Sequence, residues 1–277
     1  MRERASPAPR SGSVLGLDVG CSPRRRSSAI CRLDWDGESV SWHFARFRAV
    51  EPERSGIIAA VAGGRPALAA ALDGPLRAGF DEIGRYRMAE RMLTRRLGPL
   101  IGKPGQSGVP VGRLLNAQAN LCARAVLAVA DLASARHDVA IDAKAVAEAF
   151  PNSFLGLMLD APEKVPVRRS NRSDRYFVQL TRDGTLLRLL EHCLPGRRPA
   201  VDLATITNHD DRAAFVCALT ALGLVAGAFV AVGDGDGWIV LPPAPFIRPR
   251  RWALLAANSA ESPDALHVAG GVPHGPV

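Results

Sequence analysis

The sequence contains no apolar run long enough to cross a bilayer and no recognisable export signal. No stretch approaches the roughly 18 apolar residues that a membrane-spanning helix requires. The segment before residue 13 is rich in Arg, Ser and Pro and lacks the apolar core of a secretory signal. We therefore expect a cytoplasmic protein without a membrane partner.

Cysteine is scarce. The five cysteines are odd in number, and no two of them form a CxxC pair. A disulfide framework or a cysteine-based zinc site is not expected, and reduced thiols in the cytoplasm are the simplest interpretation. The six histidines also lack the spacing of metal ligands.

Lysine is nearly absent, so arginine carries the basic charge. The net charge is +8, and only Lys103, Lys144 and Lys164 are lysines. Arginine suits bidentate phosphate contacts, and excess positive charge permits binding to DNA or RNA. A genome whose base composition favours arginine codons would give the same excess. The consecutive Arg24, Arg25 and Arg26 are candidate substrate-binding residues, with a solvated charge cluster as the alternative.

The length of 277 residues suits one domain with a single good core. We expect that domain to cover residues 13–256. Residues 1–12 and 257–277 are predicted to be disordered tails, because they are rich in Pro, Ser, Gly or Ala and lack periodicity. The oligomeric state is not predicted.

The opening of the chain predicts three strands, at about 13–18, 28–33 and 39–47. Asp36-Gly37 is a strong signal for a hairpin turn between the second and the third. The second strand should therefore be antiparallel to its neighbours, with Asp18 on a central strand.

Helices and strands alternate in the remainder of the chain. Helices are predicted at about 57–62, 83–97, 114–136, 174–194 and 209–224, and strands at about 67–73, 139–148 and 237–242. The helix at 174–194 is expected to be interrupted near Asp183-Gly184, and Asn208 is the predicted N-cap of the helix at 209–224. Three antiparallel strands followed by alternating helices and parallel strands predict an α/β fold. In this fold, helices flank a mixed sheet.

Carboxylates occur where such a sheet would gather them. Asp18 ends the first strand, Asp73 ends the fourth, and Asp210 and Asp211 open a helix. Functional sites of α/β sheets form at the carboxyl ends of strands, and a helix N-terminus favours ionised acids. Clustered carboxylates need a counter-ion such as magnesium or manganese. Two such ions, roughly 4 Å apart, can promote phosphodiester hydrolysis.

Most of these acids also have a purely structural explanation. Asp73 precedes Gly-Pro and is a natural turn residue, and Asp210 or Asp211 is a natural acid of a first helical turn. Glu148 is a fourth candidate catalytic acid, although a surface role is equally consistent. His209 can assist proton transfer or serve as an exposed residue of the helix start.

Four stretches resemble an uncharacterised prokaryotic family of predicted RNase H-like nucleases, related to the Holliday-junction resolvases. They are Leu-Gly-Leu-Asp-Val-Gly at 15–20, Ala-Leu-Asp-Gly-Pro-Leu at 71–76, Ala-Glu-Ala-Phe-Pro at 147–151, and His-Asp-Asp-Arg-Ala-Ala-Phe-Val-Cys-Ala-Leu-Thr-Ala at 209–221, the most specific of the four. Gly-Trp-Ile-Val-Leu-Pro at 237–242 follows the last of them. The likeness extends over most of the chain.

The resemblance implies an RNase H-like fold with Asp18, Asp73, Glu148 and Asp210 or Asp211 near one metal site. It implies a metal-dependent nuclease by analogy, since a fold does not determine a function. The chain departs from the related resolvases at one position. They carry a second helix acid about three residues after the first, where this chain has Ala213. Asp211 is a possible substitute, but its side chain points about 100° away around the helix.

Two other functions remain open. One is a non-catalytic RNase H-like module that binds nucleic acid or a partner, which the missing helix acid and the positive charge favour. The other is an ATP-dependent phosphotransferase of the sugar-kinase and actin-like class, which also opens with a Gly-Leu-Asp-x-Gly turn. Such proteins usually duplicate the domain, and this chain has no internal repeat.

Overall fold

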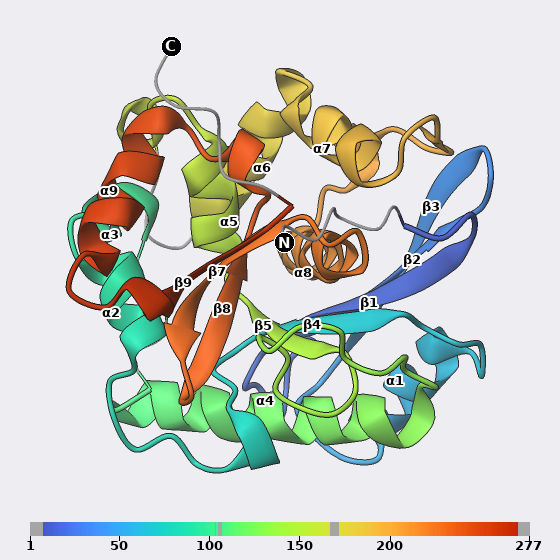
Figure 1. The fold of residues 1–277 in the computed structure, drawn as a ribbon. Coiled ribbons are helices and arrows are strands. Elements are labelled where there is room, and N and C mark those ends of the chain that lie inside the picture. Colours follow the sequence, from blue (N-terminus) through green and yellow to red (C-terminus); the bar gives the residue numbers. More distant parts are fainter. Residues whose placement is uncertain (1–7, 103, 105–106, 167–171, 271–277) are drawn as a thin grey trace.

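One mixed β-sheet runs through the structure (Figure 1), a computed structural model that describes residues 8–102, 104, 107–166 and 172–270. In these residues the strand order is β6-β3-β2-β1-β4-β5-β8-β7-β9. The strands are β1 (Gly12–Asp18), β2 (Ser28–Trp35), β3 (Ser39–Phe47), β4 (Ala69–Asp73), β5 (Val146–Ala149), β6 (Arg198–Pro199), β7 (Phe229–Asp234), β8 (Gly237–Leu241) and β9 (Leu266–Ala269).

The directions of the strands agree with the prediction from sequence. β2 is antiparallel to both β1 and β3, whereas β1, β4, β5 and β8 are parallel to one another. β1 lies between β2 and β4, so Asp18 is on an interior strand, as predicted. The α/β class and the mixed sheet flanked by helices are therefore confirmed.

Helices cover both faces of the sheet (Figure 1). They are α1 (Glu53–Ala62), α2 (Met88–Thr94), α3 (Gly98–Ile101), α4 (Pro110–Val129), α5 (Pro151–Met158), α6 (Arg172–Arg182), α7 (Thr185–Cys193), α8 (His209–Val225) and α9 (Pro249–Ser259). α5 to α8 lie on one face, and α1 and α4 lie on the other. α2 and α9 pack against β7 and β9, respectively.

The alternation of side chains along β1 and β4 defines these two faces. Val14, Ala69 and Ala71 pack in one core cluster with α8. Leu15, Leu17, Ala70 and Leu72 pack in a second cluster with α1 and α4. Residues that share the parity of Val14 and Ala69 therefore face α8.

α8 crosses β1 at very short range because β1 has a glycine there. A Cβ atom on Gly16 would lie 2.1 Å from the backbone nitrogen of Ala218 and 2.2 Å from the carbonyl oxygen of Ala214. No other residue fits this approach, so Gly16 fixes the position of α8 over the centre of the sheet.

The helix that was predicted at 114–136 is displaced toward the N-terminus. α4 begins at Pro110, at a position where proline is compatible with a first helical turn, and ends at Val129. Beyond its end, Leu132 pairs with Ala67 through an isolated bridge, which uses the backbone in extended form. The strand predicted at 139–148 shrinks to β5, since Asp142 forms a turn with Lys144 before it.

The chain after residue 256 is ordered further than the sequence predicts. α9 continues to Ser259, and β9 adds an antiparallel edge strand to β7. Leu266 and Val268 pack against the cluster that contains Leu255 of α9, which supplies the burial that the short strand needs. Residues 1–7 and 271–277 of the predicted tails lie outside the described residues.

No helix of the described residues is both long and apolar enough to cross a membrane.

Candidate functional site

Asp18 and Asp73 are neighbours at the carboxyl ends of two parallel strands. They are register partners in the pairing of β1 with β4. Both have the parity of the residues that face α8, so their side chains project from the same face of the sheet. The loops that follow these strands leave both carboxylates half-buried.

Among the described residues, neither member of the pair has a cation or a hydrogen-bond donor against its carboxyl group. The pKa of Asp18 is well above its usual value because of burial, and because of the nearby Asp73, Asp210 and Asp211. Burial and then the charge of Glu148 raise the pKa of Asp73 to about 7, against a lowering effect of His209. Neither carboxylate receives a hydrogen bond from any residue that the structure describes. The two acids therefore repel each other and attract protons or cations.

α8 begins above this pair. The side chain of Asn208 accepts hydrogen bonds from the backbone N–H groups of Asp210 (2.9 Å) and Asp211 (3.3 Å), which confirms the predicted N-cap. The cap fixes the first helical turn, so both acids remain close enough to Asp18 to raise its pKa.

Arg46 is the nearest cation to Asp211. Its Nε atom lies 3.7 Å from Oδ1 of Asp211, which is beyond hydrogen-bond range. That oxygen is buried and has no hydrogen-bond partner among the described residues. Burial raises the pKa of Asp211, Arg46 lowers it, and Asp210 raises it. Oδ1 of Asp211 is thus a hydrogen-bond acceptor without a donor among the described residues.

Arg46 belongs to the same row of the sheet as the acid pair. Ala29 of β2 pairs with Asp18 on one side and with Arg46 of β3 on the other. Because register partners share a face, Arg46 projects toward α8, about 10 Å from Asp18 at the usual strand spacing. The row therefore runs from two acids to a cation.

His209 is held by an acid from another helix. Its Nδ1 atom lies 3.1 Å from Oδ2 of Asp174 in the first turn of α6. The other oxygen of Asp174 accepts a hydrogen bond from Arg212 at 3.2 Å. The hydrogen bond to Asp174 is the main cause that raises the pKa of His209. His209 therefore has a defined orientation beside Asp73.

Glu148 does not join the other acids. Its register partner Leu72 packs on the α1–α4 face, so Glu148 projects from the face opposite Asp18 and Asp73. There its oxygens accept hydrogen bonds from Arg87 at 2.7 and 2.8 Å and from the N–H of Leu76 at 2.8 Å. Instead of completing the proposed acid cluster, Glu148 is saturated by a buried arginine.

Arg24, Arg25 and Arg26 lie in the loop between β1 and β2, as the sequence implies. All three are exposed. The backbone N–H groups of Arg24 and Arg25 donate to Ser22 Oγ, and Arg26 pairs with Glu53 at 3.0 Å. Glu53 also holds Arg48, so Arg26 is partly neutralised while Arg24 and Arg25 present their charge to solvent.

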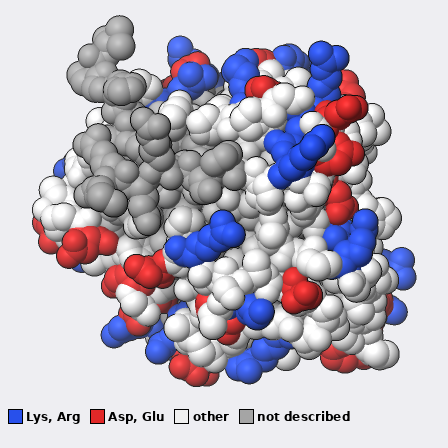
Figure 2. Space-filling view, turned by 45° about the vertical axis from the view of Figure 1, so that its right-hand side comes forward, with Lys and Arg blue, Asp and Glu red and all other residues white. Residues whose placement is uncertain are grey.

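Basic charge does not form a continuous surface on the face shown in Figure 2. Among the described residues visible there, Lys and Arg side chains occur in small separate groups with Asp and Glu between them. The net charge of +8 therefore does not create one extended basic field on this side of the molecule.

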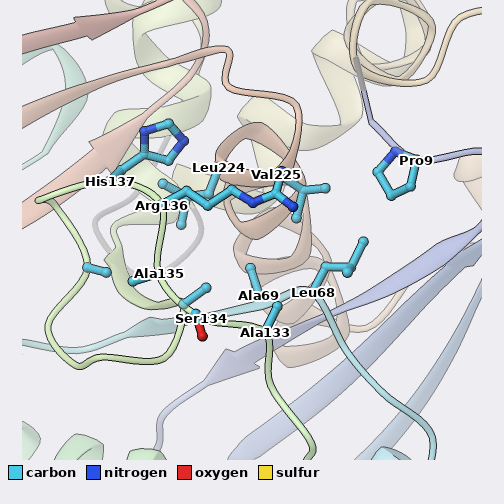
Figure 3. A pocket seen from close by; sticks show the side chains of 12 residues that line it. Pro9, Leu68, Ala69, Ala133, Ser134, Ala135, Arg136, His137, Leu224 and Val225 are labelled. Carbon is cyan, nitrogen blue, oxygen red and sulfur yellow. The ribbon is translucent and has the colours of Figure 1, made fainter. Parts of the chain in front are cut away.

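A separate pocket lies at the opposite end of α8 (Figure 3). It encloses about 480 Å³ that is partly open to solvent, and its walls include Leu68, Ala69, Leu224 and Val225. Arg136 extends across it toward Val225. About 24 Å of helix separates His209 from Val225, so this pocket is remote from the acids.

The donor set of the acid pair is compatible with magnesium or manganese. Asp18 and Asp73 offer hard carboxylate oxygens, and their repulsion is the kind that a divalent cation relieves. Across the described ranges, no group of three or more His, Cys, Asp or Glu side chains is close enough together to hold a metal ion. Asp210 and Asp211 therefore lie beside the pair but do not form a preformed group of three ligands with it.

No family model, curated protein or solved structure matches the chain.

Sequence reasoning missed three side chains that shape this site. Arg46 and Asp174 lack any local motif, although the hairpin at Asp36-Gly37 sets the register that brings Arg46 level with Asp18. Arg87 is also missed, because its partner Glu148 is 61 residues away along the chain.

Proposed function

We propose that this chain is an RNase H-like, metal-dependent nuclease that hydrolyses phosphodiester bonds of DNA or RNA. The observation that carries this proposal is the register pair Asp18–Asp73, which has no cation or hydrogen-bond donor against it among the described residues. The strand order β3-β2-β1-β4-β5, with only β2 antiparallel among these five, supports the choice of fold. The sequence resemblance points in the same direction.

Each residue of the site has a role in this proposal. Asp18 and Asp73 would hold magnesium or manganese, with Asp210 or Asp211 as a further ligand. The bound ions would supply an activated water and charge stabilisation for the leaving oxygen. Arg46, Arg24 and Arg25 would bind substrate phosphates, because each presents a guanidinium near the carboxyl end of β1.

A non-catalytic nucleic-acid-binding or partner-binding module is the second candidate. The absence of a preformed group of three metal ligands in the described residues favours it. So does Ala213, which stands where the related resolvases carry a helix acid.

Cleavage of labelled substrates tests the first proposal directly. Purified protein is incubated with single-stranded DNA, duplex DNA, RNA and an RNA–DNA hybrid, with magnesium or manganese. We expect cleavage that EDTA abolishes, and a loss of at least about 100-fold in Asp18→Asn and Asp73→Asn, since loss of a catalytic group typically costs this much or more. Asp131→Asn is the matched control, because Asp131 is exposed and lies outside the site.

The alternatives predict different results. Cleavage that survives in both Asp18→Asn and Asp73→Asn would contradict the assignment of these acids. Metal-independent binding of nucleic acid without cleavage would instead support the module. Neither result depends on a change in folding, because each variant is first compared with wild type by circular dichroism and thermal unfolding.

A further inference from the structure

A second depression adjoins the acid site, between β3 and the start of α8. Trp42 and Phe44 of β3, Thr205 and Thr207, and Asp211 of α8 contribute to its walls. Its volume of about 320 Å³ is at the lower end of the usual size range of small-ligand sites, and the depression is open to solvent. The β3 residues reach it on the face toward α8, since their register partners in β2 pack against that helix.

The aromatic wall of this depression has a defined position. Trp42 makes an edge-on contact with Phe215 of α8, with ring centroids 5.1 Å apart. Trp42 and Phe44 are both only partly buried. A planar ring that enters from solvent can therefore pack on the aromatic surface that Phe215 leaves uncovered.

At the polar end of the depression, the carboxylate of Asp211 has an oxygen with no hydrogen-bond donor among the described residues. Oδ1 of Asp211 is buried and unpartnered among the described residues, and Arg46 remains 3.7 Å away from it. An ionised carboxylate only accepts hydrogen bonds, so the missing group is an N–H or O–H donor. The side chain of Asp211 is 18% exposed and lines the depression, so a ligand that donates to its carboxylate from there would gain free energy.

Arg46 lies beside the depression and shows how far the depression is from the acid pair. Arg46 lies in the same row as Asp18 and Asp73, two strands from Asp18. A strand of nucleic acid bound along this row would have one phosphate near the acid pair and another near Arg46. Its adjacent base would then face Trp42 and Phe44.

We propose that the depression binds one unpaired nucleobase next to the phosphate that is cleaved, so that the substrate is single-stranded nucleic acid. The base stacks on Trp42 and Phe44 and donates an N–H group to Asp211, while Arg46 binds its phosphate. Guanine fits best because its Watson–Crick edge presents two adjacent N–H donors to a carboxylate. This inference rests on the proposed nuclease function, with Asp210 rather than Asp211 as the further metal ligand.

Binding without cleavage tests the base site on its own. The probes are eleven-residue abasic oligonucleotides in EDTA whose central position carries guanine, hypoxanthine or no base. Wild-type protein should bind the guanine probe about 5- to 150-fold more tightly than the abasic probe, the range expected for stacking of one base. Hypoxanthine, which lacks one donor, should lie between them. Guanine should also quench tryptophan fluorescence.

Two substitutions assign the effect to this depression. Trp42→Leu should reduce the preference for guanine over the abasic probe to less than twofold and abolish the quenching, with abasic binding unchanged. Trp42→Phe should retain most of the preference because it keeps an aromatic ring. Trp252→Phe is the matched control, since Trp252 belongs to the distant α9. Thermal unfolding shows whether Trp42→Leu remains folded, and Trp42→Phe supplies the test if it does not.

The outcomes separate this inference from the nuclease proposal. If wild type binds guanine and abasic probes equally, the base site is refuted even when the protein cleaves nucleic acid. If the preference for guanine is present but no substrate is cleaved with metal, the base site stands and the nuclease proposal falls. If no oligonucleotide is bound or cleaved, both fall.

Discussion

Acids on the two faces of the sheet differ in their hydrogen bonding. On the α1–α4 face, Glu148 is saturated by Arg87 and by the N–H of Leu76. On the α8 face, Asp18 and Asp73 receive no hydrogen bond from the described residues. The strands β4 and β5 that carry Asp73 and Glu148 are adjacent, so the difference arises from the parity of one residue position. Glu148, which has a cation, contributes to the fold. Asp18 and Asp73, which have none, are destabilised by each other and by burial, and a bound cation would remove this cost.

The largest expected effect on stability comes from removing Arg87, the cation that pairs with Glu148 on the α1–α4 face. Arg87→Met leaves Glu148 and Glu90 buried without their cation, since the guanidinium also contacts Glu90 at 3.2 Å. We expect a loss of about 3–5 kcal/mol in the free energy of unfolding, measured with urea. Arg251→Met is a matched control with a smaller expected loss, because Arg251 is equally buried but its partner Glu163 is 38% exposed. Equal losses would show that the burial of the partner acids does not determine the cost of removing the arginine.

A divalent cation should stabilise the protein by binding Asp18 and Asp73 on the α8 face. Magnesium at one hundred times its dissociation constant should stabilise wild type by about 2.7 kcal/mol, because it binds the native state alone. Asp18→Asn should lose most of this gain, while its metal-free stability stays equal or rises. The measurement is the melting temperature with and without magnesium. A metal-free Asp18→Asn protein that is less stable than wild type, with no response to magnesium in either form, would assign Asp18 a structural role.

The pH dependence of stability should report the raised pKa of Asp73, which is caused first by burial and then by the charge of Glu148. The pKa of Asp73 is about 7 in the folded protein, above its usual value of 3.8. Between these values the folded state holds a proton that the unfolded state has lost, so stability should decrease as pH rises from about 4 to about 7. Asp73→Asn should reduce this decrease by about 1–2 kcal/mol, allowing for solvent screening. Urea titrations from pH 4 to pH 8 measure it, and Asp131→Asn should behave like wild type.

The smallest effect concerns His209, which lies beside the unpaired acids. Asp174→Asn should lower the pKa of His209, because the hydrogen bond to Asp174 is the main cause that raises it. The ring resonances of His209, followed by NMR across pH 5–8, report this directly. His192 should titrate as in wild type, since burial alone lowers its pKa. An unchanged midpoint for His209 would show that Asp174 does not orient it.

The part of the fold that the sequence predicts best is the part with local signals. Alternation in 39–47 and the Asp36-Gly37 turn predict β2 and β3 and their antiparallel pairing, and Asn208 predicts the start of α8. β5 and β9 are predicted poorly because they have only four residues each, and their partners β4 and β7 come from distant parts of the chain.

The acid site is predicted in part for the same reason. Asp18 and Asp73 are found because each ends an apolar strand, and parallel strands bring such ends to one edge. The side on which Glu148 projects depends on where β5 begins, and the predicted strand at 139–148 leaves that open. The burial of Arg87 depends on packing that no local pattern encodes.

The position of Asp210 and Asp211 relative to Asp18 depends on Gly16. The backbone of α8 touches β1 where Gly16 has no side chain, and the same helix carries Asp210 and Asp211 at its start. One added methyl group would act as a wedge between sheet and helix, and it would move those acids relative to Asp18 without altering any charged group. The distance between the acids of α8 and Asp18 is therefore set by the absence of a Cβ atom at Gly16, in the middle of the sheet.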